Sequence, residues 1–429
     1  MTKNVTRKED LGSRTSEVTQ PRKRMAVIGA GPIGLEAALY AVGAGYDVNI
    51  YESGCIANHV QLWGHVRLFS PFGLNVSPWG RDAVASLIGV GELPDESAIL
   101  TGREFVRRYL IPISKSPQLD GRIHENTKVV SIGRSRLWKQ DLIGKPERAG
   151  DPFLLLLEDA QGERIAEADL VLDCSGTYGH HNHIGAGGIA CPGELQSLTD
   201  SNYSLPDVFG KDRDRFAGCK TLVAGSGYSA ATSVVSLARL ADEETGTKII
   251  WLTRSDRNSP IIRIENDQLP ERDRLAITAN QLAIDANSPV KWYSSTRVSR
   301  VDIDKTSQHF HVTILHNDFG SGQGGETTQI VVDRIIANVG YKPNRTLYEE
   351  LQIHECYATQ GPIKLAAELL GETSQDCLSQ SSHGAETLQN PEPGFFILGS
   401  KSYGRNSQFL LKVGIGQIQE LFAIGLSDE

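Results

Sequence analysis

The stretch 25-MAVIGAGPIG-34 decides the fold of this chain of 429 residues. Its first four residues are apolar, as expected of a strand that is buried on both faces of a parallel sheet. Three glycines with the spacing G-x-G-x-x-G follow, and a helical run of small and apolar residues continues to Val42. The next strand is predicted at Asp47–Tyr51. A strand, a glycine turn, a helix and a second strand within about thirty residues predict a βαβ unit.

Each glycine of this turn has its own physical role in a dinucleotide site. Gly29 permits the tight turn, Gly31 lets a pyrophosphate approach the backbone, and Gly34 lets the helix pack against the strand. The N-terminus of the helix presents its partial positive charge to the phosphates. An acid is expected about twenty residues further on. Glu52 stands directly after the second strand, where it would accept a hydrogen bond from a ribose hydroxyl.

The same order of elements recurs in the middle of the chain. A strand at Leu222–Ala224 leads into a turn with Gly225, Gly227 and Ala230, and a helix and a strand at Lys248–Leu252 follow. Alanine in the third position slightly opens the contact between helix and strand. The sequence therefore predicts a second βαβ unit with a second dinucleotide site.

The residue after the second strand of this unit differs from that of the first unit. Thr253 and Arg254 stand where an acid would be, and Arg257 follows. A guanidinium group pairs bidentately with a 2′-phosphate, so the pattern favours NADPH over NADH. The alternative is that Arg254 is a solvated charge at the end of a strand.

Charge and hydropathy exclude several classes of partner. The net charge of −9 lacks the electrostatic footprint of a nucleic-acid-binding protein. No apolar run approaches the roughly 20 residues of a membrane span, and the strongest, Phe153–Leu157, has the length of a strand. The N-terminus lacks the apolar core of a secretory signal, so we predict a cytoplasmic location.

The first 24 residues are polar and basic, with almost nothing apolar to bury. They are predicted to form a disordered tail, either a solvated leader or a contact to a membrane surface or a partner. Six cysteines are scattered along the chain without a C-x-x-C or metal-type spacing, and we expect them to be reduced. They are Cys55, Cys174, Cys191, Cys219, Cys356 and Cys377.

An acid-terminated first site and an arginine-terminated second site resemble the flavoproteins with two dinucleotide-binding domains. This superfamily includes the pyridine nucleotide-disulfide oxidoreductases and the flavin-containing monooxygenases. The resemblance implies an α/β protein with two Rossmann-like domains, in which FAD binds the first site and NADPH the second. The NADPH domain is inserted into the FAD domain. The expected limits are residues 1–24 for the tail, 25–215 and 335–429 for the FAD domain, and 216–334 for the NADPH domain.

Further stretches carry the same resemblance. Residues 126–129 are similar to the strand whose backbone, at Val129, meets the FAD adenine. Residues 172–176, ending in Gly176, and residues 336–344 are similar to the two crossings between the domains.

The last strand, 393-PGFFILG-399, is similar to the one that leads to the flavin ribityl and pyrophosphate groups. There the expected Gly-Asp pair is Gly399-Ser400, so Ser400 or Lys401 takes the place of the usual carboxylate.

The thiols favour one branch of this superfamily over the other. Disulfide reductases need two cysteines beside the flavin, and this chain has no such pair. Cys55, three residues past Glu52, is the one candidate for a single redox thiol, and an incidental thiol is the preferred interpretation. Only thirty residues follow Gly399, too few for the dimerisation domain of reductases that resemble glutathione reductase.

The resemblance therefore implies a monooxygenase that oxidises the nitrogen or sulfur of a small-molecule substrate. In such enzymes NADPH reduces FAD, and molecular oxygen forms a C4a-(hydro)peroxyflavin that the protein shields from water. The aromatic segment Trp63–Phe72 occupies the place where such proteins pass the two cofactors. Arg67 is the first candidate for a catalytic residue, to hold an amide or a peroxide anion, and His65 is the second. The alternative is that the aromatic residues are core and His65 is a satisfied surface histidine.

Two other functions remain open, and the substrate and oligomeric state are not fixed by the sequence. One is an NAD(P)H-dependent FAD reductase that passes electrons to a quinone, a protein or a disulfide. The other is a non-enzymatic nucleotide sensor. His180, His181 and His183 lack an acid or thiol partner at metal-type spacing, so we expect a polar loop between the domains and no metal.

Overall fold

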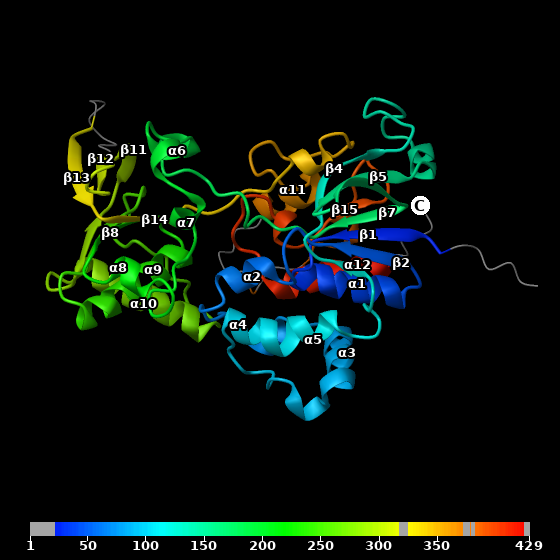
Figure 1. Ribbon diagram of the computed structural model, residues 1–429, viewed down its shortest axis with the longest axis horizontal. Coiled ribbons are helices and arrows are strands. Elements are labelled where there is room, and N and C mark those ends of the chain that lie inside the picture. Colours follow the sequence, from blue (N-terminus) through cyan, green and yellow to red (C-terminus); the bar gives the residue numbers. More distant parts are fainter. Residues whose placement is uncertain (1–21, 317–324, 372–377, 379–381, 424–429) are drawn as a thin grey trace, which may run out of the picture.

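The computed structural model describes residues 22–316, 325–371, 378 and 382–423. Figure 1 shows two lobes, with the green and yellow middle of the chain in one and the blue, cyan and red segments in the other. Each lobe contains one parallel sheet with helices and one three-stranded antiparallel sheet. The two lobes correspond to the two predicted βαβ units.

The parallel sheet of the first lobe has the order β15-β7-β1-β2-β3. Its strands are β1 (Arg24–Ile28), β2 (Asp47–Tyr51), β3 (Ile123–His124), β7 (Leu170–Asp173) and β15 (Phe395–Ile397). The central strand, β1, pairs in parallel with β2 on one side and with β7 on the other. The carboxyl ends of β1, β2, β7 and β15 therefore lie at one edge of the sheet.

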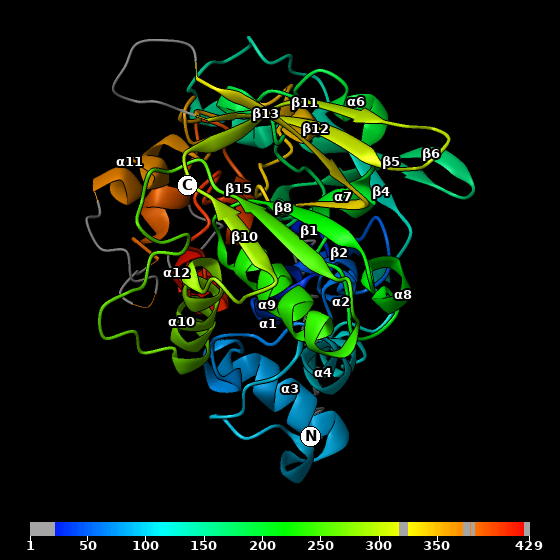
Figure 2. The ribbon, with the colours of Figure 1, turned by 90° about the vertical axis from the view of Figure 1, so that its left-hand side faces the viewer.

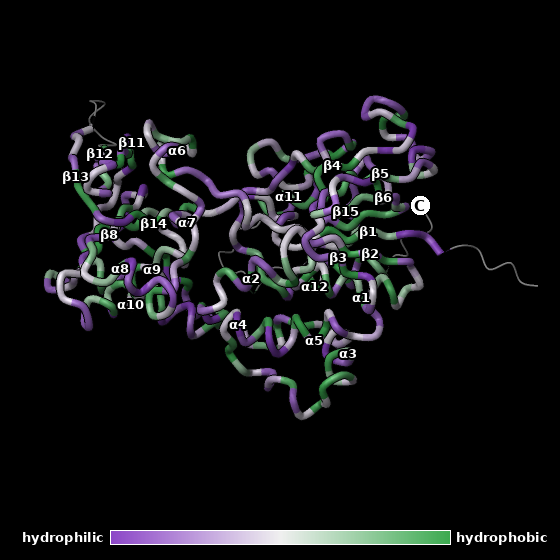
Figure 3. The backbone as a smooth tube through the Cα atoms, viewed as in Figure 1, coloured by the Kyte–Doolittle hydropathy of each residue, from purple (hydrophilic) through white to green (hydrophobic). Residues whose placement is uncertain are grey.

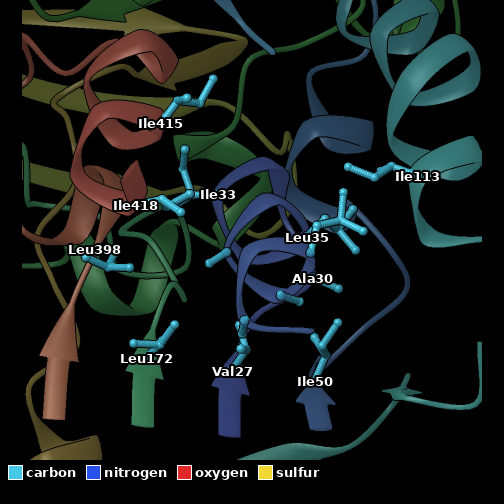
Figure 4. Packing of buried hydrophobic residues seen from close by; sticks show 14 of the residues in the cluster. Val27, Ala30, Ile33, Leu35, Ile50, Ile113, Leu172, Leu398, Ile415 and Ile418 are labelled. Carbon is cyan, nitrogen blue, oxygen red and sulfur yellow. The ribbon is translucent and has the colours of Figure 1, made fainter. Parts of the chain in front are cut away.

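Helices α1 (Pro32–Gly43) and α12 (Leu411–Ala423) pack against one face of this sheet. Figure 4 shows Val27 and Leu172 on the strands beneath Ile33 of α1 and Ile418 of α12. An antiparallel sheet covers the other face, with Phe153 and other core residues packed against β1 and β7. It is formed by β4 (Lys128–Arg134), β5 (Phe153–Asp159) and β6 (Gly162–Ala168). Figure 3 shows hydrophobic segments in the middle of this lobe, around β1 and β15, and more hydrophilic segments around β6.

The second lobe repeats this plan. Its parallel sheet has the order β10-β9-β8-β14, and helix α9 (Tyr228–Glu243) packs beside α10 (Pro270–Ile284) on one face (Figure 2). The strands are β8 (Lys220–Ala224), β9 (Lys248–Leu252), β10 (Val290–Tyr293) and β14 (Arg334–Ala337). The antiparallel strands β11 (Thr296–Ile303), β12 (Phe310–His316) and β13 (Thr327–Val332) cover the other face.

The predicted α/β fold with two Rossmann-like units is confirmed. The second sheet continues to Ala337, past the predicted limit at 334, because β14 pairs in parallel with β8. Ile184 and Leu198 lie in the core of the second lobe, although they precede residue 216. Arg24, predicted in the tail, begins β1 and pairs with Asp169, and residues 1–21 of the tail lie outside the described residues.

Helix α2 (Asn58–Leu62) follows the first βαβ unit, and three more α-helices lie between it and β3. They are α3 (Pro78–Ile88), α4 (Gly102–Phe105) and α5 (Ile111–Ser114), with a π-helical turn at Val106–Leu110 between the last two. Phe105 and Tyr109 are fully buried in this segment. Pro112 has no N–H to donate into the π-helical turn. Among the described residues, no helix is long and apolar enough to cross a membrane.

Candidate functional site

The first glycine turn closes tightly at two positions and is open at the third. Gly29 has φ of +96°, and a Cβ atom there would lie 3.0 Å from the carbonyl oxygen of Cys174. A Cβ atom at Gly34 would lie 1.9 Å from the carbonyl oxygen of Gly29, so α1 approaches β1 as only glycine allows. Nothing lies within 4 Å of a Cβ atom at Gly31. The open position is the one predicted to receive a pyrophosphate.

Glu52 lies between this turn and the beginning of β4. Its side chain accepts hydrogen bonds from the backbone N–H groups of Ala30 at 2.8 Å and Gly54 at 2.9 Å, and the residue is 8% exposed. Thr127 donates its backbone N–H to the Glu52 carbonyl oxygen at 2.8 Å, two residues before Val129. Oε1 also accepts from the Ser53 hydroxyl, whereas Oε2 accepts one bond among the described residues and keeps a second lone pair for a ribose hydroxyl.

The carboxyl ends of β7 and β15 meet beside the same turn. Gly176 and Gly399 have φ of +70° and +71°. A Cβ atom at Gly176 would lie 3.4 Å from Ser400 Oγ, and one at Gly399 would lie 3.3 Å from the side chain of Ile33. The backbone N–H of Gly399 donates to Gln417 Oε1 at 2.9 Å. Residues from three distant parts of the chain therefore converge on the first turn.

The sequence analysis missed one charged group at this place. Asp173, the last residue of β7, pairs with Lys401. The available signal was an acid at the carboxyl end of a strand buried on both faces, within the crossing assigned to residues 172–176.

The second glycine turn repeats the geometry of the first. Gly225 has φ of +138°, and a Cβ atom there would lie 2.2 Å from the carbonyl oxygen of Asn338. Ala230 is fully buried, and Gly227 has nothing within 4 Å of a Cβ atom. Arg254, which follows β9 and the buried Thr253, is exposed. In the part of the chain that the structure describes, its guanidinium has no ion pair.

The predicted aromatic segment Trp63–Phe72 touches the second glycine turn. The ring of Phe69 meets the ring of Tyr228 edge to face, with 5.4 Å between the centroids. Tyr228 is the first residue of α9 and directly follows Gly227. The segment therefore connects the first lobe to the second dinucleotide turn.

The two predicted catalytic residues take different positions. Arg67 is exposed and donates from Nη1 to the carbonyl oxygen of Ile99 at 3.2 Å, which anchors it to the loop before α4. His65 is half-buried against the backbone of Pro206 at the start of the second lobe, and burial lowers the pKa of its imidazole despite nearby Asp207. No contact among the described residues joins Arg67 to either glycine turn.

The thiols near the first turn are not paired. All five described cysteines are free, and Cys377 lies outside the described residues. Burial raises the pKa of the Cys174 thiol, and burial with Glu194 raises the pKa of Cys191 to about 12. Hydrogen bonds from Thr359 lower the pKa of Cys356.

The histidine cluster forms part of the connection between the lobes. The ring of His181 stacks on Tyr203 with 3.5 Å between centroids, and His183 Nδ1 lies 3.2 Å from Glu194 Oε1. Within the described ranges, no three His, Cys, Asp or Glu side chains are grouped to hold a metal ion.

Comparison with known proteins gives the fold. No protein-family model matches the chain, and no curated protein matches it. A bacillithiol disulfide reductase of Bacillus cereus has 17% identity and a TM-score of 0.62 over 95% of this chain and 100% of its own. Thioredoxin reductase of T. acidophilum has 14% identity and a TM-score of 0.58, over 95% and 100%.

A third similar structure is the ornithine N-hydroxylase of Kutzneria sp. 744, solved with reduced FAD, NADP⁺ and L-ornithine. It has 14% identity and a TM-score of 0.59, over 94% of this chain and 99% of its own. The chain therefore shares its overall fold with these two reductases and this hydroxylase. Both reductases and a hydroxylase share this fold, so the fold leaves the reaction open.

Two alanine variants of the first turn compare a closely packed glycine, Gly34, with an open one, Gly31. Gly34→Ala places a methyl group 1.9 Å from a backbone oxygen and should cost about 3 kcal/mol, although alanine is otherwise the better helix former. For a unit of this size the thermal midpoint should fall by about 10 °C. Gly31→Ala meets open space and should shift the midpoint by less than about 2 °C. Thermal unfolding followed by circular dichroism tests both variants, and equal midpoints would contradict the packing at Gly34.

Thiol labelling tests the cysteine environments. At neutral pH, iodoacetamide should label Cys356 first, because its lowered pKa raises the thiolate fraction, and should then label the exposed Cys55. Cys174 and Cys191 should react only after denaturation. Peptide mass spectrometry measures the order, and early labelling of Cys174 in the native protein would contradict its burial.

Proposed function

We propose that this protein is an FAD- and NADPH-dependent oxidoreductase, with FAD at the first glycine turn and NADPH at the second. One observation carries the proposal. Two turns of the same form are each open at the middle glycine, and the Phe69–Tyr228 contact brings the second turn against the first lobe. A hydride transfer between two nucleotides needs two such sites facing a common space.

The residues around the first turn fit FAD. Gly31 and the N-terminus of α1 would bind the pyrophosphate, Glu52 a ribose hydroxyl, and the Val129 backbone the adenine. Gly176 and Ser400 would line the ribityl chain. FAD would supply the acceptor for a hydride, and the protein would supply its position and exclude water. The structural neighbour from Kutzneria, which was solved with reduced FAD and NADP⁺, supports the same pair of cofactors.

The second turn fits NADPH in the inserted unit, which we place from the connection before β8 to the end of β14. Gly227 leaves room for the pyrophosphate, with Gly225 and Ala230 closing the turn. Arg254 is exposed and unpaired within the described chain, so it is available for a 2′-phosphate. An Arg254 guanidinium that was paired with a carboxylate would not favour NADPH over NADH.

For the reaction, we propose monooxygenation at the nitrogen or sulfur of a small molecule. The support is the state of the thiols, because Cys174 beside Gly29 is partly buried with a raised pKa and has no partner thiol among the described residues. A buried neutral thiol is a poor nucleophile for disulfide exchange. The aromatic segment Trp63–Phe72 would form the wall that keeps water out, and His65 would remain neutral there because burial lowers its pKa.

The position of Arg67 favours a second candidate, an NAD(P)H-dependent reductase. Its guanidinium is anchored to Ile99 at the surface, so it offers no cation beside the glycine turns. A reductase needs no such cation, since the electrons leave to an external quinone, protein or disulfide.

The rates at which different acceptors reoxidise the protein distinguish these functions. The protein is first reduced anaerobically with NADPH and then mixed with oxygen, with a quinone or with a disulfide. The monooxygenase proposal predicts that oxygen reoxidises the reduced protein fastest. Faster reoxidation by the quinone or the disulfide would establish the reductase. Tight nucleotide binding without any reduction would point to a nucleotide sensor.

The FAD assignment predicts the colour of a single variant. Gly31→Val should fold, because the position is open, but should purify without FAD, since the side chain would occupy the place of the pyrophosphate. Absorbance gives the FAD content and circular dichroism the fold. A folded variant with the FAD content of the wild type would refute the site.

The NADPH assignment predicts the effect of Arg254→Ala. Loss of the charge-assisted hydrogen bonds should raise the KM for NADPH by about 10- to 100-fold and leave that for NADH almost unchanged. Arg239→Ala, at an exposed arginine of the same unit, is the matched control and should change neither. Equal changes for both nucleotides would remove the 2′-phosphate argument.

A further inference from the structure

A fully buried ion pair lies at the carboxyl edge of the first sheet. Lys401 Nζ donates to Asp173 Oδ2 at 2.6 Å and to Ser175 Oγ at 3.0 Å, and both charged side chains have no exposed surface. Asp173 Oδ1 accepts from the Ser175 hydroxyl at 2.6 Å and from its backbone N–H at 3.1 Å. The Lys401 ammonium also lies 5.0 Å from the centre of the Tyr348 ring. Every partner of the pair belongs to the protein.

Stability alone does not explain this pair. Removing two charges from water costs free energy that their attraction only partly returns, and apolar residues often replace such pairs without loss of stability. The best-attested benefit of a buried charged group is that it fixes one arrangement of the chain over others. The question is therefore which arrangement this pair fixes.

The pair joins two turns that are 228 residues apart in the sequence. Asp173 ends β7 and precedes Gly176, and Lys401 ends the 3₁₀ turn Gly399–Lys401 that follows β15. These are the turns that meet where Ser400 Oγ faces Gly176.

Backbone pairing holds the two strands together as far as Leu398, whose N–H donates to the Asp173 carbonyl oxygen at 3.0 Å, and the two turns continue beyond this bond. Gly176 offers no side chain, and Ser400 is partly exposed. The Gly399 N–H holds its turn to Gln417 of α12, which is a contact on the other side of the turn. The bonds of Lys401 to Asp173 and Ser175 are thus side-chain links between the two turns beyond this last backbone bond.

We propose that Lys401 and Asp173 are positioning residues of the FAD site, whose buried ion pair sets the spacing between the turns at Gly176 and Ser400. This inference rests on the proposed function, because it takes FAD as the ligand of these turns. Neither residue touches the ligand. They act through the backbone of the two turns.

Variants of both partners test this role. Lys401→Met leaves a buried carboxylate unpaired, Asp173→Asn leaves a buried ammonium unpaired, and the double variant leaves no unpaired charge. The double variant keeps the test available if a single variant fails to fold. Arg272→Met is the matched control, since the Arg272–Asp267 pair of the second lobe is also 2.6 Å long and buried.

The readouts are the Kd for FAD from titration of the apoprotein, the Kd for NADP⁺, and the thermal midpoint. The double variant should have a midpoint near that of the wild type, but its Kd for FAD should rise at least about tenfold, because the turns lose their preset spacing. Its Kd for NADP⁺ should stay within about twofold, as should the Kd for FAD of Arg272→Met despite a lower midpoint.

Two results would overturn the inference while the proposed function stands. One is a double variant that binds FAD as tightly as the wild type, and the other is an Arg272→Met control that loses FAD affinity by the same factor. A wild-type protein that binds no FAD would overturn the proposed function together with the inference.

Discussion

The close approach of a helix to a strand at a glycine is the constraint on which the rest of the structure depends. In the first unit the contact is between Gly34 of α1 and the carbonyl oxygen of Gly29, and in the second the fully buried Ala230 of α9 lies against Gly225. Each contact fixes how the helix leaves its strand, so that the N-terminus of the helix lies over the carboxyl edge of the sheet. Both candidate nucleotide sites follow from this geometry. Glu52 in the first unit and Arg254 in the second follow the second strand of their βαβ unit, so both lie at the carboxyl edge of their own sheet.

Two buried carboxylates, Glu52 and Asp173, form polar contacts near the contact of Gly34 with Gly29. Glu52 ties the end of β2 to the glycine turn through the Ala30 N–H, and the Asp173–Lys401 pair ties β7 to the turn after β15. Buried charges of this kind are costly unless every partner is present. The partners of Glu52 and Asp173 lie at the carboxyl edge of the first sheet. They hold the ends of β2 and β7 in place, while the position of Gly31 stays open. A preformed site of this form suits a cofactor that stays bound while substrates change.

The sequence was sufficient for those features that depend on local chemistry. Glycine spacing, apolar runs and helix length predicted both units, and the structure brings Gly29, Glu52, Gly176 and Gly399 to one place. Side-chain direction was not predictable, because it depends on tertiary neighbours. Arg67 lies in the predicted segment, yet its guanidinium reaches the Ile99 carbonyl oxygen, and no local pattern distinguishes that partner from a ligand.

Pairing between distant residues was equally hidden from the sequence. Lys401 was noted as a substitute for the missing carboxylate, but its partner Asp173 is 228 residues away, and no spacing rule connects them. The predicted end of the second unit at residue 334 was too early for a similar reason. Residues 336–344 resemble a crossing between the domains, and the pairing of β14 with β8 is not visible in the sequence.

We propose that the two nucleotide sites exchange a hydride, and an anaerobic titration of the purified protein with NADPH measures this exchange most directly. The absorbance of oxidised flavin should disappear as about one NADPH is added per bound FAD, and NADH at the same concentration should act more slowly. A protein that binds FAD but keeps its oxidised spectrum in excess NADPH would refute the exchange.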